Sequence, residues 1–154
     1  MASAAFYPPV GFFFKVSIDG LPDADSAFQE VTGLSVSVET QAVPEGGENR
    51  FVHQLPLRAK AERLVLKRGL DVSSQLLRWC RKAVEEFSFS PKTIHVFLLD
   101  PSKPDALNNP LAAWHVVNAY PVKWSVSAFN AEENSLAVET IELQYNYFTK
   151  SFPD

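Results

Sequence analysis

The chain has 154 residues, of which 46% are hydrophobic and 21% are charged, and this balance excludes a disordered protein. Its 18 acidic and 14 basic residues give a net charge of −4, which is the wrong sign for a domain that binds nucleic acid through its phosphates. A single cysteine, Cys80, excludes an internal disulfide and a multi-cysteine zinc site, so we expect one ordinary globular domain over residues 1–154.

The N-terminal lead, residues 1–11, has no basic n-region and contains Pro8 and Pro9, so it is not expected to be a signal peptide. The longest apolar segment, around residues 94–99, is far shorter than the roughly 20 residues that a membrane span needs. We therefore expect a protein that folds in the cytoplasm, without a Sec-type export signal and without membrane insertion of its own.

Alternation of apolar and polar residues with a period of two predicts most of the elements. A strand is expected over residues 12–18, followed by a turn and a short apolar piece over residues 28–31. Residues 34–40 predict a half-buried strand, in which Val36 and Val38 face the core and the alternating polar residues face outward.

Residues 41–59 break this rhythm. Pro44 and Pro56 each lack the N–H that a central strand needs, and a plain connector of about 19 residues is unusually long for a compact domain. Because the segment is nevertheless apolar in places, we predict an inter-subunit arm that buries these side chains against another chain. The residues assigned to this interface are Val43, Glu45, Glu48, Phe51, Val52, Leu55, Leu57, Arg58, Lys60 and Arg63.

One helix is predicted, over residues 73–87, after a strand at residues 64–66. Ser73 is the expected N-cap, and Pro91 prevents the helix from continuing. Cys80 lies on the apolar stripe of this helix, where a packed and inert thiol is expected rather than a nucleophile. The whole stripe consists of Leu76, Leu77, Cys80, Ala83, Val84 and Phe87.

Strands return after the helix. They are expected over residues 93–99, over residues 111–119, in a separate strand opened by Pro121, and over residues 140–147. The order of strands, helix and strands predicts a mainly β (α+β) fold, an antiparallel β-barrel or sandwich with one α-helix, rather than a doubly wound fold.

The sequence offers no convergent catalytic set, and we expect no catalytic, cofactor-binding or metal-binding residues and no cofactor. His53 lies in the arm, while His95 and His115 lie in apolar strands without an acidic residue or cysteine at ligand spacing, so core or interface histidines are favoured. A basic cluster has acidic residues nearby and is interpreted as an ion-pairing surface rather than a nucleic-acid site. This cluster consists of Arg58, Lys60, Arg63, Lys67 and Arg68.

Several segments form an ordered series along the chain: residues 31–34 (VTGL), residues 66–69 (LKRG), Trp79, Trp114, residues 118–121 (NAYP) and residues 138–141 (VETI). From Phe12 to about Tyr147 this series resembles the tail tube proteins of contractile phages and of the related extracellular contractile injection systems.

The resemblance implies a structural subunit of the inner tube, with hexameric rings that stack head to tail around a cargo channel. It further implies a contractile sheath and baseplate or tube-initiator proteins as partners, and assembly in the cytoplasm into an extracellular or virion-like particle. A longer turn at residues 21–27, a Pro-rich loop at residues 100–110 and the lead leave two roles open, main tube subunit or baseplate-proximal tube initiator.

A channel lining needs strands with one wet face, and a lining with few apolar or cationic groups would let cargo pass without sticking. The channel-lining candidates are Ser35, Ser37, Glu39, Thr140, Glu142, Gln144 and Asn146, for which an ordinary solvent-facing sheet surface is the alternative. A different class of function also stays open. The 12 Phe, 4 Tyr and 3 Trp residues would suit a small-ligand-binding β-barrel with an aromatic cavity, which needs no oligomer.

Overall fold

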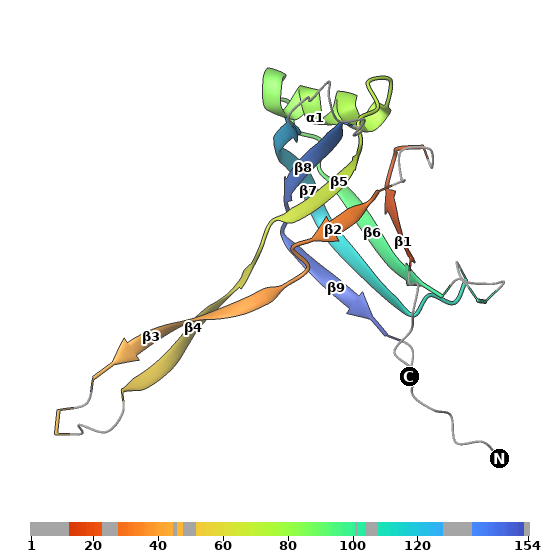
Figure 1. Cartoon of the computed structure of the whole chain (residues 1–154). Helices are drawn as coiled ribbons and strands as arrows, with labels where there is room; N and C mark the ends of the chain where they lie inside the picture. The colour runs from red at the N-terminus through yellow and green to blue at the C-terminus, as the bar shows by residue number, and fades with distance from the viewer. Residues whose placement is uncertain are drawn as a thin grey trace, which may run out of the picture.

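The computed structural model describes residues 13–22, 28–44, 46–47, 52–100, 102–103, 108–127 and 137–152, so the N-terminal lead lies outside it. The body of the protein is a twisted sheet with one helix against it, and a two-stranded arm projects from this body (Figure 1). In chain order the elements are β1 (Phe13–Ile18), β2 (Glu30–Thr32), β3 (Val36–Val43), β4 (His53–Ala61), β5 (Leu64–Gly69), α1 (Gln75–Glu86), β6 (Lys92–Leu99), β7 (Ala112–Val126), β8 (Val138–Gln144) and β9 (Tyr147–Ser151).

The body sheet has seven strands in the order β1-β6-β7-β8-β5-β2, with β9 paired to β7, and every pairing is antiparallel. The long strand β7 connects two halves of this sheet. Its first part pairs with β6 and β9, and its second part, from Tyr120 to Val126, pairs with β8. The predicted fold class, antiparallel sheets with one helix, is confirmed.

The prediction that Pro121 opens a separate strand is wrong, because β7 runs through it without interruption. Pro121 is fully buried and lies where the β7–β8 register shifts, between Pro121 and Lys123. A bulge of this kind removes the need for the N–H that proline lacks. Three residues earlier, Asn118 has a φ of 55°, and the β6–β7 register also shifts near this point. Two irregularities therefore let one strand serve both halves of the sheet.

The core lies between the sheet and α1. Its sheet side is formed by alternating apolar residues on β1, β5, β6, β7 and β8, as half-buried strands require. The fully buried members with the largest aliphatic side chains are Leu64, Leu66, Leu76, Ile94, Leu99, Ile141 and Leu143.

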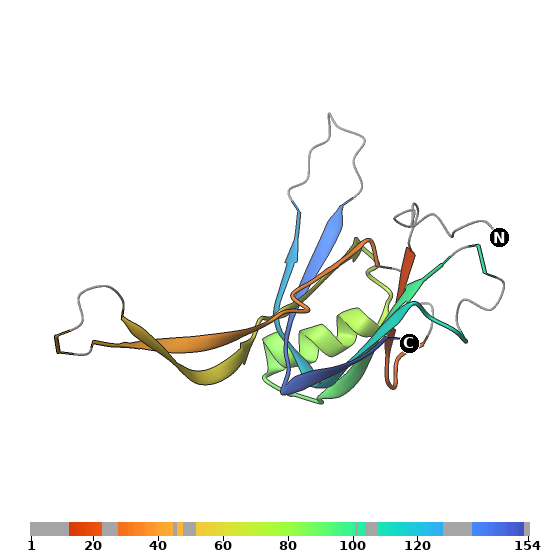
Figure 2. The same ribbon diagram turned by 90° about the horizontal axis from the view of Figure 1, so that it is seen from below.

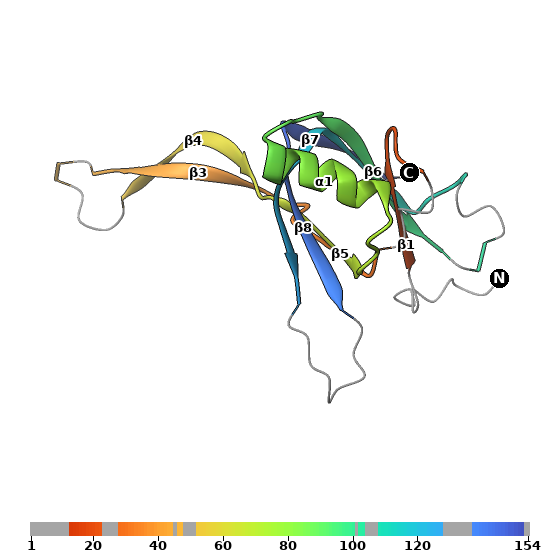
Figure 3. The ribbon, with the colours of Figure 1, turned by 90° about the horizontal axis from the view of Figure 1, so that it is seen from above.

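Helix α1 packs against β7, and its N-cap lies one residue later than predicted (Figure 3). The N-cap is Ser74, whose hydroxyl accepts a hydrogen bond from the Leu77 N–H at 3.0 Å, whereas the Ser73 hydroxyl donates to Asp71. The helix ends at Phe87, which has the left-handed conformation that is common at C-caps.

The predicted apolar stripe is correct for Leu76, Leu77, Cys80 and Ala83, which are all buried. It is wrong for its last two members, since Val84 is 49% and Phe87 is 83% exposed. Trp79 is buried in their place, and its indole N–H donates to the Ser90 carbonyl at 2.8 Å. The helix therefore faces the sheet along a stripe shifted toward its N-terminal half.

The arm is a regular antiparallel ribbon of β3 and β4 that reaches away from the body (Figures 1 and 2). Two sequence-based predictions are therefore wrong. The strand over residues 34–40 is not half-buried, because Val36 and Val38 are each 57% exposed, and residues 53–61 form a strand despite Pro56. The ladder tolerates Pro56 because the register shifts beside it, leaving Leu57 as the extra residue.

The single strand that was predicted over residues 140–147 is in fact divided between two strands. Strand β8 ends at Gln144, Asn146 donates its N–H to the Val117 carbonyl at 3.0 Å, and Tyr147 begins β9. Tyr147 is 56% exposed, so it does not continue the buried face of Ile141 and Leu143.

Gly33 lies where the chain leaves β2 for the arm. Its φ is 94°, and a Cβ at this position would lie 1.8 Å from the carbonyl oxygen of Arg63, between β4 and β5. Only glycine fits such a crossing, because both the backbone conformation and the close approach exclude a side chain. Gly33 therefore fixes the point at which the arm leaves the body.

Candidate assembly surfaces

The arm presents most of the residues predicted for the inter-subunit interface. Val52, Leu55 and Leu57 are 51%, 51% and 58% exposed, and Val43 is partly buried near the end of β3. Three further predicted residues, Glu45, Glu48 and Phe51, lie outside the described residues. Exposed apolar side chains on a ribbon that covers no core indicate a contact surface.

Two further exposed apolar residues of the arm were not predicted, because their alternation imitates that of a core strand. Val36 and Val38 lie on one face of β3, opposite Ala61 and Ala59 on β4. Val36, Val38 and Ala59 are exposed, so this face of the arm is an uncovered apolar strip at its root.

The other face of the arm root is polar and joins a predicted channel residue to a predicted interface residue. Arg58 lies opposite Glu39, and its Nε donates to Oε2 of Glu39 at 2.7 Å. The hydrogen bond from Arg58, and then its charge, lowers the pKa of the Glu39 carboxyl, and the same contacts raise the pKa of Arg58. Next to this pair, the Ser37 hydroxyl donates to the Lys60 carbonyl at 3.5 Å. The root of the arm therefore has one apolar and one charged side.

A second surface is formed by the outward face of β8. Thr140, Glu142 and Gln144 alternate there with the buried residues of the same strand. Glu142 lies 3.9 Å from Arg63 and 3.5 Å from Lys123, and Lys67 on β5 lies opposite Thr140. This face is polar as predicted.

The expectation that this face carries few cationic groups is wrong, since Lys67, Lys123 and Arg63 all border it. Each of these cations lies near a carboxylate, and Lys67 is 3.4 Å from Glu30 on β2. The face is thus wet and mixed in charge.

The seven channel-lining candidates do not share one surface within a chain. Ser35 and Ser37 lie at the root of the arm with Glu39, and Asn146 lies in the turn between β8 and β9. Only the three outward residues of β8 lie on a face of the body sheet.

A buried ion pair was missed, because Arg68 was assigned to an ion-pairing surface. Arg68 and Glu139 are 4% and 0% exposed, and Arg68 Nε donates to Glu139 Oε1 at 2.7 Å. A second guanidinium nitrogen donates to the hydroxyl of Ser74, the N-cap of α1, and the guanidinium lies 5.8 Å from the centroid of the Phe28 ring. One signal in the sequence could have identified this pair: Arg68 is in phase with Leu66, just as Glu139 is in phase with the buried residues of β8.

Cys80 is packed, as predicted. It is fully buried, and burial, together with the nearby charge of Glu139, raises the pKa of its thiol to about 12. A thiol in this state does not act as a nucleophile near neutral pH.

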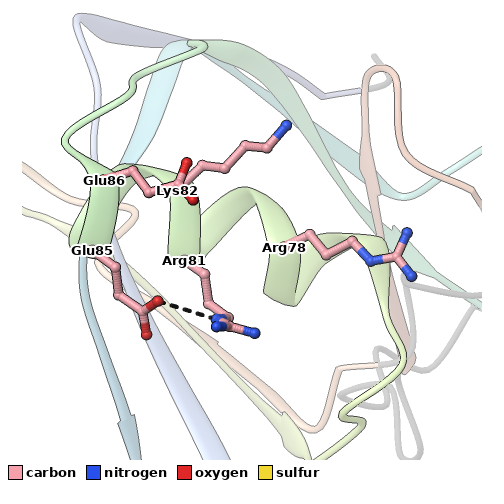
Figure 4. Close-up of a pocket in the computed structure, with 5 residues that line it drawn as sticks. All are labelled: Arg78, Arg81, Lys82, Glu85 and Glu86. Atoms are coloured by element: carbon pink, nitrogen blue, oxygen red, sulfur yellow. Dashed lines mark hydrogen bonds and ion pairs between the residues drawn. The ribbon is translucent and has the colours of Figure 1, made fainter.

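A shallow depression lies on the solvent side of α1, and the side chains that line it project from this one helix (Figure 4). Arg81 points toward Glu85 there, with 3.3 Å between Nε and Oε2. All the lining residues are exposed, whereas catalysis depends on an enclosed site with shielded charges. These residues are Arg78, Arg81, Lys82, Glu85 and Glu86.

In the described ranges of the chain, no three side chains of His, Cys, Asp or Glu converge as a ligand set, and no helix has the length and apolar character that a membrane crossing requires. Of the histidines, His53 lies on β4 in the arm, and His95 and His115 lie opposite each other on β6 and β7.

Comparison with known proteins gives a consistent result. The family described as T4-like virus tail tube protein gp19 matches residues 10–149. None of the curated proteins matches by sequence.

Among solved structures, the chain is similar to a chain of the anti-feeding prophage (AFP) baseplate, with a TM-score of 0.76, 25% identity and coverage of 99% and 98% of the two chains. A chain of the PVC extracellular contractile injection system sheath–tube complex in the extended state gives a TM-score of 0.77 at 22% identity, with coverage of 99% and 100%. A chain of the AFP tube-terminating cap gives 0.78 at 21% identity, with coverage of 99% and 97%.

Proposed function

The chain belongs to the family of the T4-like virus tail tube protein gp19, and from this premise we propose that its subunits form hexameric rings that stack around a channel. It is a structural tube protein of contractile injection systems and not an enzyme. The interior between the sheet and α1 is filled by core side chains, so the alternative of a ligand-binding β-barrel is set aside.

The observation that supports stacking is the arm. Its two strands pair with each other along their length, apart from the bulge at Leu57, yet Val36, Val38, Leu55 and Leu57 remain more than half exposed on a ribbon that lies outside the body. Burying such side chains needs another surface, and the contact is heterologous because the arm meets a different patch on its neighbour. Heterologous contacts produce rings when they close and filaments when they continue, and a stacked tube uses both.

We assign the arm, residues 41–59, to contacts between subunits. Its apolar side chains supply the buried area, and its charged root, with Arg58, Lys60 and Arg63, supplies orientation. The predicted tip residues Glu45, Glu48 and Phe51 belong to the same proposal.

We assign the outward face of β8 to the channel. Thr140, Glu142 and Gln144 form a polar row, and the carboxylate of Glu142 lies near both Arg63 and Lys123, whose charges it partly neutralises. A neighbouring subunit that continues this face would extend the polar lining around the ring.

The similar structures, which are a baseplate, a sheath–tube complex and a tube-terminating cap, support a proposal for the partners and the place of the assembly. For this chain we propose a contractile sheath and baseplate proteins as partners, cargo in the lumen, no stable nucleic-acid binding, and assembly in the cytoplasm into an extracellular particle. The proposal applies equally to a main tube subunit and to a baseplate-proximal tube initiator.

The test replaces residues 43–57 with a short Gly/Ser linker. We expect a folded monomer by circular dichroism and sedimentation, whereas the unmodified chain forms rings or tubes in negative-stain micrographs. A chain that no longer folds, or one that still forms normal tubes, would overturn the role of the arm. An unmodified chain that sediments only as a monomer at high concentration, and joins no tube with its baseplate partners, would overturn the proposed function.

A further inference from the structure

His95 and His115 form a cross-strand pair on the face of the sheet opposite to the core. They are directly opposed in the β6–β7 register, next to the buried pair Ile94 and Val116, and their Nδ1 atoms are 2.7 Å apart. The other ring nitrogen of His95, Nε2, lies 3.1 Å from Oδ1 of Asp19. The side chains of His95 and Asp19 are 26% and 61% exposed, so solvent reaches the group.

With Asp19 ionised and both imidazoles neutral, these contacts assign the protons to particular nitrogen atoms. The carboxylate of Asp19 only accepts hydrogen bonds, so Nε2 of His95 carries the proton that it donates. A neutral His95 then has its lone pair on Nδ1, and this lone pair accepts from the Nδ1–H of His115. The result is a linear relay from His115 through His95 to Asp19, in which Nδ1 of His95 is already an electron-pair donor.

We propose that the Nδ1 atoms of His95 and His115 bind one divalent transition-metal ion of the class that prefers imidazole, such as Zn²⁺, Ni²⁺ or Cu²⁺, with water in the remaining positions. On binding, Nδ1 of His115 gives its proton to solvent and Nε2 of the same ring takes one up from solvent, so the ring changes tautomer with no net release of protons. Two metal–nitrogen bonds form, and two of the waters bound to the free ion leave.

The distances suit such an ion. Two imidazole nitrogens on a tetrahedral zinc are about 3.3 Å apart, given Zn–N bonds of about 2.0–2.1 Å. The present Nδ1–Nδ1 separation is shorter by about 0.6 Å, so both side chains rotate on binding until their lone pairs converge on the ion. The two strands meanwhile stay in place, because their ladder holds the backbones on either side.

Two neighbours hold the rings in this orientation. Asp19 accepts from the far nitrogen of His95, which is the carboxylate–histidine arrangement that orients metal-bound histidines and raises their basicity. Phe97 stacks on the His95 ring at 6.2 Å between centroids and meets the His115 ring edge-on at 6.4 Å. The site is thus supported on one side by a carboxylate and on another by an apolar ring.

The test is calorimetric titration of the untagged full chain with Zn²⁺, repeated with the substitutions His95→Gln and His115→Gln. We expect one ion per chain and a loss of at least about tenfold in affinity in either variant, with His53→Gln as a matched control that keeps wild-type binding. Asp19→Asn is expected to weaken binding by about tenfold without abolishing it, because it changes only the hydrogen bond that orients His95 and leaves both ligands in place.

A second readout does not depend on variants. Cu²⁺ bound to the wild-type chain should give an electron paramagnetic resonance spectrum with coupling to two imidazole nitrogens. The proposal is overturned if the wild-type chain shows no saturable binding at millimolar metal, if folded His95→Gln and His115→Gln bind as the wild type does, or if the spectrum shows a single nitrogen.

Discussion

Arg68 and Glu139 lie directly opposite each other on β5 and β8, and the guanidinium donates to the carboxylate over 2.7 Å with both side chains buried. The pair continues two rows of core residues, Leu64–Leu66 and Ile141–Leu143, at the end of the sheet where α1 begins. Through Ser74 it also contacts the N-cap of the helix, so three elements meet at one charged contact.

We predict that Glu139→Gln lowers the free energy of unfolding by about 3–5 kcal/mol, because it leaves a buried guanidinium without its carboxylate. The double variant Arg68→Met/Glu139→Leu should be markedly less destabilised, since it removes both charges and keeps the volume. Equilibrium urea unfolding at a fixed protein concentration measures both. A cost below about 1 kcal/mol for Glu139→Gln would contradict this account of the pair.

We predict that Gly33→Ala destabilises the protein by about 2–4 kcal/mol, because the new Cβ meets the Arg63 carbonyl in a left-handed backbone conformation. Gly46→Ala is the matched control, since a Cβ there meets nothing within 4 Å, and its effect should stay within about 0.5 kcal/mol. Thermal and urea unfolding compare the two variants. Equal stabilities would show that the crossing at Gly33 is not as close as described.

We predict that the wild-type chain loses stability between about pH 9 and pH 12 more steeply than Cys80→Ala does. The pKa of the Cys80 thiol is raised to about 12 in the fold, chiefly by burial, whereas in the unfolded chain it lies near about 8.5. In this window the folded state therefore binds more protons than the unfolded state, and stability falls as pH rises.

Urea unfolding at a series of pH values measures this difference. Burial also raises the pKa of Tyr145, but this group is present in both proteins and cancels in the comparison. At neutral pH the substitution should cost roughly 1 kcal/mol, and the native thiol should react slowly with thiol reagents but rapidly in urea. Parallel pH profiles, or fast stoichiometric labelling of the native protein, would refute a buried, neutral Cys80.

We predict that Leu57→Asp abolishes stacking while leaving the subunit folded. Leu57 is 58% exposed at the bulge of the arm, so a charge there costs the free subunit little but opposes burial against a neighbour. Val72→Asp is the control, because Val72 is 78% exposed on the body. Sedimentation and negative-stain microscopy report assembly, and circular dichroism reports folding. Normal tubes from Leu57→Asp, or equal loss in both variants, would count against the arm as the interface.

Much of the body could be predicted from the sequence, because half-buried strands keep one apolar face. The patterns over β1, β5, β6 and β8 therefore identified strands whose inward residues are buried. The arm could not be distinguished in the same way. Val36 and Val38 alternate with polar residues as a core strand does, and alternation alone does not reveal whether the apolar face meets its own chain or another.

The remaining errors come from residues that act against their usual preference. Pro121 was expected to open a separate strand and Pro56 to exclude one, but each lies beside a register shift, where a strand tolerates proline. Arg68 was read as a surface charge although its phase matched the core. The pairing of His95 with His115 depended on the register between β6 and β7, which only the folded sheet supplies.

The pairing of the two arm strands has a consequence for how fast subunits join. A segment that folds only on binding must lose its conformational entropy at the moment of contact. The β3–β4 ribbon has its hydrogen bonds before any neighbour arrives, so docking has to order only side chains. We therefore expect the growth of a tube to be limited by the frequency and orientation of encounters between subunits, with no slow folding step after each addition.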